Sequence, residues 1–273
     1  MKCSTIIDRI KKKLKENKNY VGAIIGGVRE GKSITGCKFC EKIDKTFKDN
    51  IKERCFFNVK TLIHFINTKP MKFFKGKAFI LDEGGVAVGH REALSIANKR
   101  FGDLLQSWGY LNAALFITSP SLSFIDKSAR GTMLNGVFRV IGHNKKQGIC
   151  YVKVYDVRGN PFTGDGVRPF PHKVINGEQI DIEGLKVRLP SLSIIKAYNK
   201  LSYKAKKEIS QNAEKKMEEE DKGPVKKSYR DKLHDTIMNL KNKGNMTNRE
   251  IQKITGIPKR TIENWTADTN TTT

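Results

Sequence analysis

The sequence is short of acidic residues and has no long apolar run. It has 273 residues, with 28 aspartates and glutamates against 52 lysines and arginines, so its formal net charge is +24. This excess points to a polyanionic partner, with nucleic acid as the first candidate and a lysine-rich coding bias as the alternative. No apolar run approaches a membrane span, and residues 1–19 lack the apolar centre of a signal peptide. We therefore expect no membrane span and a cytoplasmic location.

Cysteine and histidine are too scattered to predict a metal site or a disulfide framework. There are five cysteines, and an odd count in an intracellular protein argues against structural disulfides. Only Cys37 and Cys40 stand close together, within a segment of helical character, and no second close pair completes a zinc site. The five histidines show no ligand spacing. We interpret the cysteines as core thiols, with a metal or redox role as the alternative.

One octapeptide carries the most specific pattern in the chain. It consists of Gly26, Gly27, Val28, Arg29, Glu30, Gly31, Lys32 and Ser33, and it matches G-x-x-x-x-G-K-[ST] at every fixed position. A predicted buried strand (20–25) precedes this glycine loop, and a predicted helix (32–47) follows it. In this context backbone N–H groups surround the phosphates of ATP, Lys32 reaches the β- and γ-phosphates, and the Ser33 hydroxyl is a ligand of Mg²⁺. The alternative is a glycine-rich turn with a chance lysine.

Two acidic residues follow a second apolar run. Residues 77–81 predict a buried strand, and Asp82 and Glu83 come directly after it. At the carboxyl edge of a parallel sheet, Asp82 would lie near the glycine loop and support Mg²⁺. Glu83 would orient and deprotonate the attacking water, which favours hydrolysis over storage of the nucleotide. The alternative is an exposed turn with two solvated carboxylates.

The alternation of strands and helices predicts the α/β class. We expect further strands over 55–59, 112–118, 137–141 and 149–154, the last two forming an antiparallel hairpin, and a helix over 92–108. Residues 159–184 read as loops. The expected fold is a mainly parallel P-loop NTPase sheet flanked by helices, with a small all-α C-terminal module.

The C-terminal part is helical throughout. One predicted helix carries Ile194, Tyr198, Leu201, Ala205 and Ile209 on one face, and Gly223 and Pro224 break the helical pattern. Three shorter helices follow, with a capping box at Thr247 and a turn at Gly256.

This C-terminal pattern resembles a helix-turn-helix, in which the third helix enters the major groove of DNA. On that resemblance, four residues of the third helix would face double-stranded DNA: Lys259, Arg260, Thr261 and Asn264. The alternative is a three-helix bundle for protein contact.

These patterns divide the chain into four segments. Residues 1–190 form the expected ATPase core, including a basic N-terminal helix, and 191–228 form a charged helix and linker. Residues 229–268 form the helix-turn-helix module, and 269–273 are expected to be a disordered tail.

Three stretches resemble the FtsK/HerA-type ATPases: 82–85, 98–100 and 115–130. The resemblance spans about residues 20–154 and is strongest to ATPases of archaeal viruses and plasmids, which include packaging and conjugation motors. It implies a homo-oligomeric ring, commonly hexameric, with ATP between subunits. It also implies that Thr118 and Ser119 sense the γ-phosphate, where many members have glutamine. Arg130 would be an arginine finger, with Arg91 and Arg100 as weaker candidates and a salt bridge or DNA contact as the alternative.

The expected function is an ATP-hydrolysing motor or remodelling enzyme for double-stranded DNA, encoded by a virus or mobile element and active inside the host cell. A Ras-type GTPase is excluded because Asn98-Lys99-Arg100 is followed by phenylalanine, not aspartate. Two alternatives remain: an AAA+-like replication initiator or helicase loader, and a non-enzymatic DNA-binding regulator gated by ATP.

Overall fold

The computed structural model describes most of the chain. It describes residues 4–82, 102, 104, 108–125, 130–131, 133–159, 166–176, 178–221, 229–244 and 246–267. The chain divides into two compact units, Met1–Lys206 and Lys207–Thr273, and each is described by itself. The predicted helix over 92–108 falls mostly outside the described residues, and so does the predicted tail.

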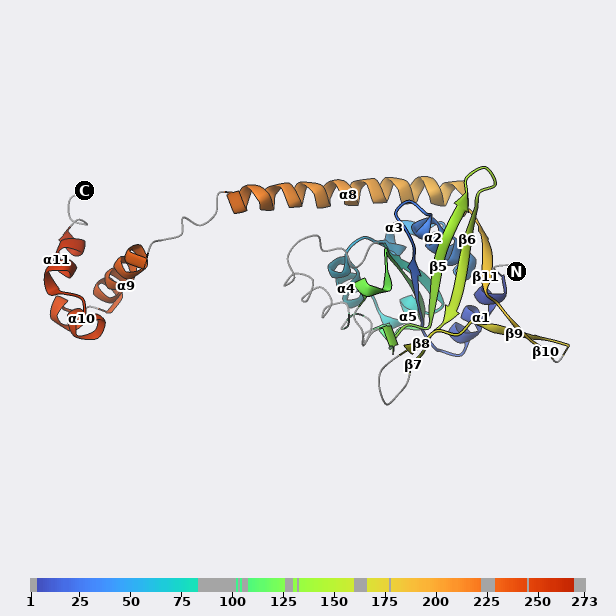
Figure 1. The fold of residues 1–273 in the computed structure, drawn as a ribbon, viewed down its shortest axis with the longest axis horizontal. Coiled ribbons are helices and arrows are strands. Elements are labelled where there is room, and N and C mark those ends of the chain that lie inside the picture. The colour runs from blue at the N-terminus through green and yellow to red at the C-terminus, as the bar shows by residue number, and fades with distance from the viewer. Residues whose placement is uncertain are drawn as a thin grey trace. The chain divides into compact units, whose positions relative to one another are not determined.

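A seven-stranded sheet forms the first unit, and its strand order is β11-β6-β5-β1-β4-β3-β2 among the described residues (Figure 1). The strands are β1 (Tyr20–Ile25), β2 (Cys55–Phe56), β3 (Lys77–Leu81), β4 (Ala113–Ser119), β5 (Gly136–Asn144), β6 (Ile149–Asp156) and β11 (Gly184–Arg188). Strands β1 to β5 pair in parallel, whereas β6 and β11 add in antiparallel fashion. The mainly parallel α/β class is therefore confirmed, and so is the hairpin of β5 and β6.

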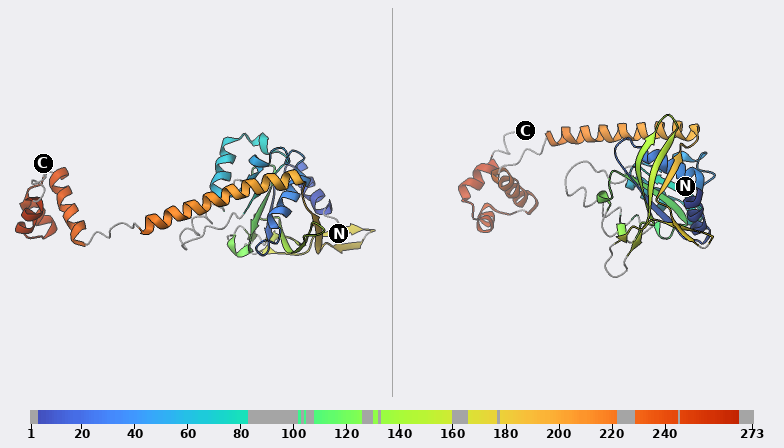
Figure 2. Two further views of the ribbon diagram at one scale, coloured as in Figure 1. Left: turned by 90° about the horizontal axis from the view of Figure 1, so that it is seen from above. Right: turned by 45° about the vertical axis from the view of Figure 1, so that its right-hand side comes forward.

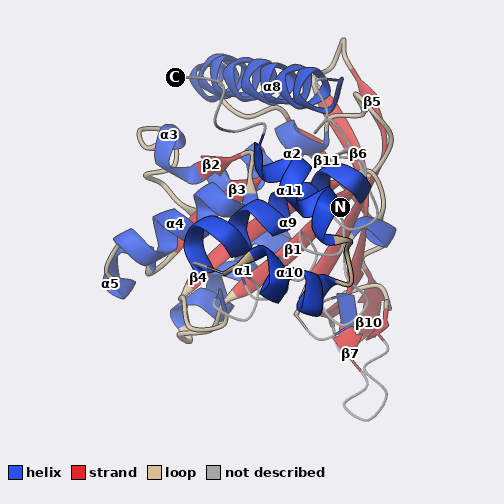
Figure 3. Ribbon diagram, turned by 90° about the vertical axis from the view of Figure 1, so that its left-hand side faces the viewer, coloured by secondary structure: helices blue, strands red, loops and turns tan. Residues whose placement is uncertain are grey.

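Helices cover both faces of this sheet (Figure 3). Helices α1 (Ser4–Lys15) and α2 (Lys32–Ile43) pack on one face, against Ile24, Ile80 and Phe116. Helices α4 (Val59–Thr68) and α5 (Met71–Phe74) pack on the other face, against neighbours of those residues such as Phe79 and Leu115. Successive strand residues point to opposite faces, so nearly continuous apolar strands such as β4 fill both cores.

The stretch predicted as loops holds short strands instead. These are β7 (Arg158–Gly159), β8 (Gly166–Val167), β9 (His172–Ile175) and β10 (Glu178–Asp181), and the hairpin of β9 and β10 extends away from the sheet (Figure 2). Strand β11 begins at the end of the same stretch. It pairs with β6 through buried Leu185 and Val187, whereas its other side chains are more exposed, and this alternation is the strand signal that was not recognised.

Helix α8 (Leu192–Asp221) begins in the first unit and continues beyond Lys206. Ile194, Tyr198 and Ser202 are buried at spacings of four residues, but Ile209 is 54% exposed. The apolar face predicted through Ile209 therefore packs only along the first part of the helix. None of the helices in the described residues is long and apolar enough to cross a membrane.

Among its described residues, the second unit contains the end of α8 and three shorter helices, α9 (Tyr229–Gly244), α10 (Asn248–Thr255) and α11 (Lys259–Ala267). Ile237, Ile251 and Ile262, one from each helix, form its buried core. The capping box predicted at Thr247 is present, and Gly256 ends α10 with a positive φ of 70°. Because L side chains rarely adopt that conformation, glycine suits this tight turn. Ile254 on the same helix as Ile251 is 63% exposed, so it does not belong to this core.

The remaining short helices in the described residues are α3 (Ile51–Arg54) and the 3₁₀ helix η1 (Leu122–Phe124). Helix α3 leads directly into β2. The 3₁₀ helix follows β4, so it lies in the chain just after the strand end that carries two of the candidate site residues.

Candidate nucleotide site and candidate DNA-facing helix

The glycine loop joins β1 to the first turn of α2, as the sequence predicts. Its crest is exposed, whereas Lys32 is only 9% exposed. The Lys32 Nζ donates to the carbonyl oxygens of Gly26 at 3.0 Å and Gly27 at 2.7 Å. The side chain of Lys32 thus reaches back to the start of the loop, where two backbone carbonyls bind its ammonium group.

Gly31 shows why this loop requires glycine where the helix begins. Its φ is 90° and its ψ is 19°, in the left-handed region. A Cβ at this position would also lie 2.8 Å from the Cys150 Sγ, which is closer than carbon and sulfur can pack. Backbone conformation and the neighbouring β6 strand therefore both exclude a side chain here.

Asp82 is the centre of the polar contacts beside the loop. The hydroxyls of Ser33 and Thr118 each donate to its Oδ1 at 2.6 Å. The Tyr198 hydroxyl donates to its Oδ2. Asp82 is 2% exposed, so this carboxylate is held by hydrogen bonds in place of water. We call these four residues the Asp82 cluster.

The strand order brings Ser33, Asp82 and Thr118 of this cluster together. Strand β4 lies between β1 and β3, so its carboxyl end stands between the glycine loop and Asp82. In the register of these strands Thr118 is beside Ile24, and Ile117 is beside Leu81. Because parallel strands end at one edge, three separate segments deliver polar side chains to the same place.

The Asp82 cluster suits Mg²⁺ chemically. Hydroxyl and carboxylate oxygens are the ligands that Mg²⁺ prefers. Among the described residues there is no group of three or more His, Cys, Asp or Glu side chains that could hold a metal ion. An ion here would therefore take its remaining ligands from phosphate and water, which is the usual arrangement for Mg²⁺ with a nucleotide.

The side chain of Glu30 forms a hydrogen bond within the glycine loop. Its carboxylate accepts a hydrogen bond from the Gly27 N–H at 2.5 Å. The same carboxylate would meet a Cβ placed on Gly26 or Gly27, at 2.8 and 2.7 Å. A carboxylate thus occupies a backbone donor of the kind that binds phosphate in such loops.

The other predicted catalytic residues do not belong to the Asp82 cluster. The Ser119 Oγ donates to the Ser121 carbonyl at 2.8 Å, so it stabilises the turn after β4. The Arg130 Nε is buried, and it has no hydrogen-bond partner in the described part of the chain. Glu83 lies outside the described residues, as do Arg91 and Arg100.

Tyr198 is the contact that sequence reasoning missed. It was placed on the apolar face of its helix, and its ring does pack there, but the hydroxyl reaches Asp82. Burial, followed by the charge of Asp82, raises the pKa of Tyr198 far above its ordinary value, so the hydroxyl remains a donor. A polar-tipped side chain within an apolar stripe was the signal available in the sequence.

Four of the five cysteines lie in the described residues, and all four are buried free thiols, as expected for core residues. These are Cys37, Cys40, Cys55 and Cys150. Cys3 lies outside the described residues. Burial raises the pKa of the thiols of Cys40, Cys55 and Cys150, which disfavours the reactive thiolate.

Helix α11 presents polar side chains on the side away from its buried residues. Lys259, Arg260 and Asn264 are exposed and Thr261 is half-buried, whereas Ile262 is buried and Trp265 packs partly against the same core. Lys259 forms an ion pair with Glu263 at 3.3 Å. Arg260 and Asn264, one turn apart, are therefore the better placed of the four for a base or phosphate.

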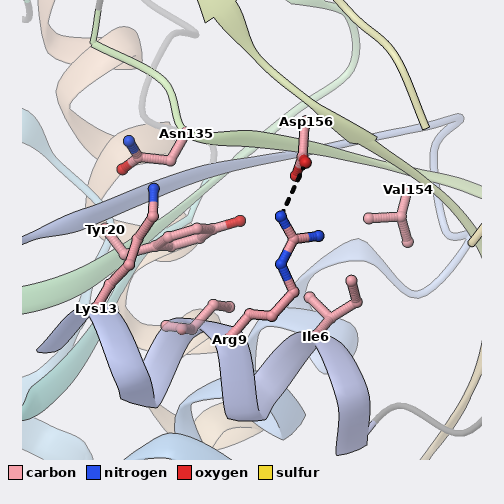
Figure 4. A pocket seen from close by; sticks show the side chains of 8 residues that line it. Ile6, Arg9, Lys13, Tyr20, Asn135, Val154 and Asp156 are labelled. Atoms are coloured by element: carbon pink, nitrogen blue, oxygen red, sulfur yellow. Dashed lines mark hydrogen bonds and ion pairs between the residues drawn. The ribbon is translucent and has the colours of Figure 1, made fainter. Parts of the chain in front are cut away.

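A small hollow of about 30 Å³ lies between α1 and the amino-terminal end of β1 (Figure 4). Arg9 of α1 forms an ion pair with Asp156 across it at 3.0 Å, and Tyr20 and Lys13 also line it. Because Tyr20 begins β1 and the glycine loop follows its end, this hollow is at the opposite edge of the sheet from the Asp82 cluster. Its contacts attach α1 to the sheet.

This chain matches no family model and no curated protein. Among solved structures it is similar to the N-terminal domain of zonular occludens toxin from Neisseria meningitidis, with a TM-score of 0.33 and 14% identity, over 51% of this chain and 84% of that one.

Proposed function

We propose that this protein binds ATP with Mg²⁺ at the glycine loop and hydrolyses it to move or remodel double-stranded DNA. The observation that carries the proposal is the convergence of Ser33, Asp82 and Thr118 through hydrogen bonds of 2.6 Å beside the loop. A lysine, a serine and an aspartate in this arrangement are the parts that hold phosphate and magnesium in P-loop enzymes.

Binding of ATP would exchange the internal contacts of the loop for contacts with phosphate. Lys32 would leave the carbonyls of Gly26 and Gly27 for the β- and γ-phosphates, and the Gly27 N–H would exchange Glu30 for phosphate. When bound, Mg²⁺ would neutralise charge on the phosphates, held by Ser33 and through Asp82. Each of these groups is already beside the loop.

Hydrolysis would require a base and a group that senses the γ-phosphate. We assign the base to Glu83, which follows Asp82 directly in the chain. Thr118 and Ser119 end the strand between the loop and Asp82 and are the proposed sensors. Arg130 is proposed as the finger for a neighbouring subunit's ATP in a homo-oligomeric ring, commonly hexameric in the FtsK/HerA-type ATPases that the sequence resembles.

The proposed DNA contact lies in the second unit, in the helix-turn-helix assigned to residues 229–268. Three helices with a short turn between the last two suit this motif, and α11 would enter the major groove. The net charge of +24 also favours DNA as the partner. Packaging of a viral genome and DNA transfer by a plasmid are the two settings that the resemblance suggests.

The test is steady-state ATP hydrolysis with and without double-stranded DNA, with Glu83→Gln as the variant. We expect hydrolysis that DNA stimulates and that Glu83→Gln abolishes while ATP still binds. Bound ATP with negligible turnover under both conditions would instead favour the ATP-gated DNA-binding regulator. Turnover retained in Glu83→Gln would contradict the assignment of the base.

A further inference from the structure

Helix α8 reaches the Asp82 cluster from a distant part of the chain. Tyr198 is 116 residues from Asp82 in sequence, and its hydroxyl donates to the Oδ2 atom, the oxygen that Ser33 and Thr118 leave unused. Its ring lies 6.0 Å from that of Phe57, just after β2. The packing against Phe57 thus holds the ring of Tyr198, and the hydrogen bond to Asp82 holds its hydroxyl. Tyr198 is 6% exposed.

The start of α8 is attached to the core independently of Tyr198. The Ser191 N–H donates to the Glu41 Oε1 at 3.0 Å, across 150 residues of sequence. Ile194 is fully buried in the core that α2 helps to form. These two contacts, made by Ser191 and Ile194, hold the start of α8 against the core. The backbone that carries Tyr198 is therefore positioned by contacts other than its own bond to Asp82.

We propose that Tyr198 is a positioning residue for magnesium, acting through Asp82. This inference rests on the proposed function, because it concerns the same site. By bonding to Oδ2, the hydroxyl orients the carboxylate so that Oδ1 faces Ser33, the other residue that would hold the ion. Partners of this kind, which orient a metal-binding carboxylate without touching the metal, commonly change metal affinity by about 10–100-fold when removed.

Through Tyr198, helix α8 would become part of the nucleotide site. The helix continues past Lys206 as one element, so its last part belongs to the second unit. A shift of α8 that moved Tyr198 would change the orientation of Asp82, and occupation of the magnesium site would in turn favour one position of α8. Reciprocal coupling of this kind links ATP to the segment that leads to the C-terminal helices.

The structural alternative is that Tyr198 only fills space beneath α8. Tyr198→Phe separates the two, because it keeps the ring against Phe57 and removes the hydroxyl. Tyr203 provides a matched control on the same helix, since it is 74% exposed. Tyr203→Phe removes the same atom at a position away from the site.

The test measures binding of a non-hydrolysable ATP analogue to the full chain over a series of Mg²⁺ concentrations. We expect Tyr198→Phe to bind the analogue normally without Mg²⁺ but to need about tenfold more Mg²⁺ for half-maximal enhancement. Tyr203→Phe should match the wild type. A Mg²⁺ midpoint for Tyr198→Phe equal to that of the wild type would overturn the inference while leaving the proposed ATP site intact.

A second measurement uses only the wild-type chain. Amide hydrogen exchange of residues 194–202 should slow when Mg²⁺ is added to the complex with the analogue, whereas that of α1 should not change. Unchanged exchange in α8 would contradict the coupling. Failure of the wild type to bind the analogue at any Mg²⁺ concentration would overturn the proposed function itself and this inference with it.

Discussion

Single side chains determine what the glycine loop and its neighbours can do. One carboxylate, Asp82, accepts hydrogen bonds from three hydroxyls, and one lysine is held by two carbonyls of the loop. These contacts keep polar groups that are nearly buried in defined positions, because an unpaired buried charge would be costly. The site is thus organised by internal hydrogen bonds that phosphate and magnesium would partly replace.

Glu30 should oppose nucleotide binding. Its carboxylate occupies the Gly27 N–H and adds negative charge where phosphate is expected. Glu30→Ala should therefore tighten binding of ATP by about tenfold, since hydrogen bonds to charged groups contribute roughly 1.5–3 kcal/mol. Equilibrium titration with a fluorescent ATP analogue measures this. Equal or weaker binding by the variant would show that Glu30 does not compete with phosphate.

At the level of helices and strands, the features that depend on local sequence patterns could be predicted. The glycine loop between a strand and a helix, the strand before Asp82 and the hairpin of β5 and β6 follow from local patterns. The order of the strands does not, because no local pattern places β4 between β1 and β3. The juxtaposition of Thr118 with Asp82 needed that order.

Two further features of the elements were not predicted. Strand β11 is short, adds at an edge of the sheet and begins where the stretch of predicted loops ends, so its alternating pattern covers only a few residues. The contact of Tyr198 with Asp82 joins residues 116 positions apart, and helical periodicity reports only that its side faces the core. Separation in sequence made the contact of Tyr198 with Asp82 inaccessible, whereas the alternation of buried and exposed residues in β11 is a local signal.

The anchor of α8 on α2 should depend on pH. Burial alone would raise the pKa of Glu41, but hydrogen bonds from Lys38 and from Ser191 outweigh it and lower the pKa below its ordinary value. A lowered pKa in the folded state means that the stabilisation is present above the ordinary carboxylate pKa and is lost as pH falls through the lowered value. Acid should thus release this anchor.

Glu41→Gln tests that dependence by urea unfolding. At pH 7 the variant should lose about 1 kcal/mol of unfolding free energy, the typical value of a hydrogen bond. The difference from the wild type should shrink below about pH 4, near the ordinary pKa of glutamate. The exposed Glu178 supplies the control Glu178→Gln, which should show no difference at either pH. A constant loss at all pH values would contradict the assignment.

At the level of the complete chain, the two units carry different candidate binding sites. The first carries the glycine loop, and the second carries exposed Arg260 and Asn264 on α11. If α11 contacts DNA, Arg260→Ala should weaken binding and reduce the slope of log affinity against log salt by about 1, because one phosphate or base contact is lost. Fluorescence anisotropy of labelled duplex DNA measures both quantities.

Lys200→Ala is the control for that measurement, since Lys200 is an exposed lysine on α8 and its loss changes net charge equally. It should leave the affinity and the slope nearly unchanged. Equal effects of the two variants would mean that DNA responds to total charge and not to α11.

The most direct test of the account is equilibrium binding of ATP to the full chain with and without Mg²⁺, comparing the wild type with Lys32→Ala. Lys42, an exposed lysine on the same helix, provides the control Lys42→Ala. We predict that the wild type and Lys42→Ala bind ATP, more tightly with Mg²⁺, and that Lys32→Ala loses this binding. Equal binding by all three proteins would contradict a nucleotide site at the glycine loop.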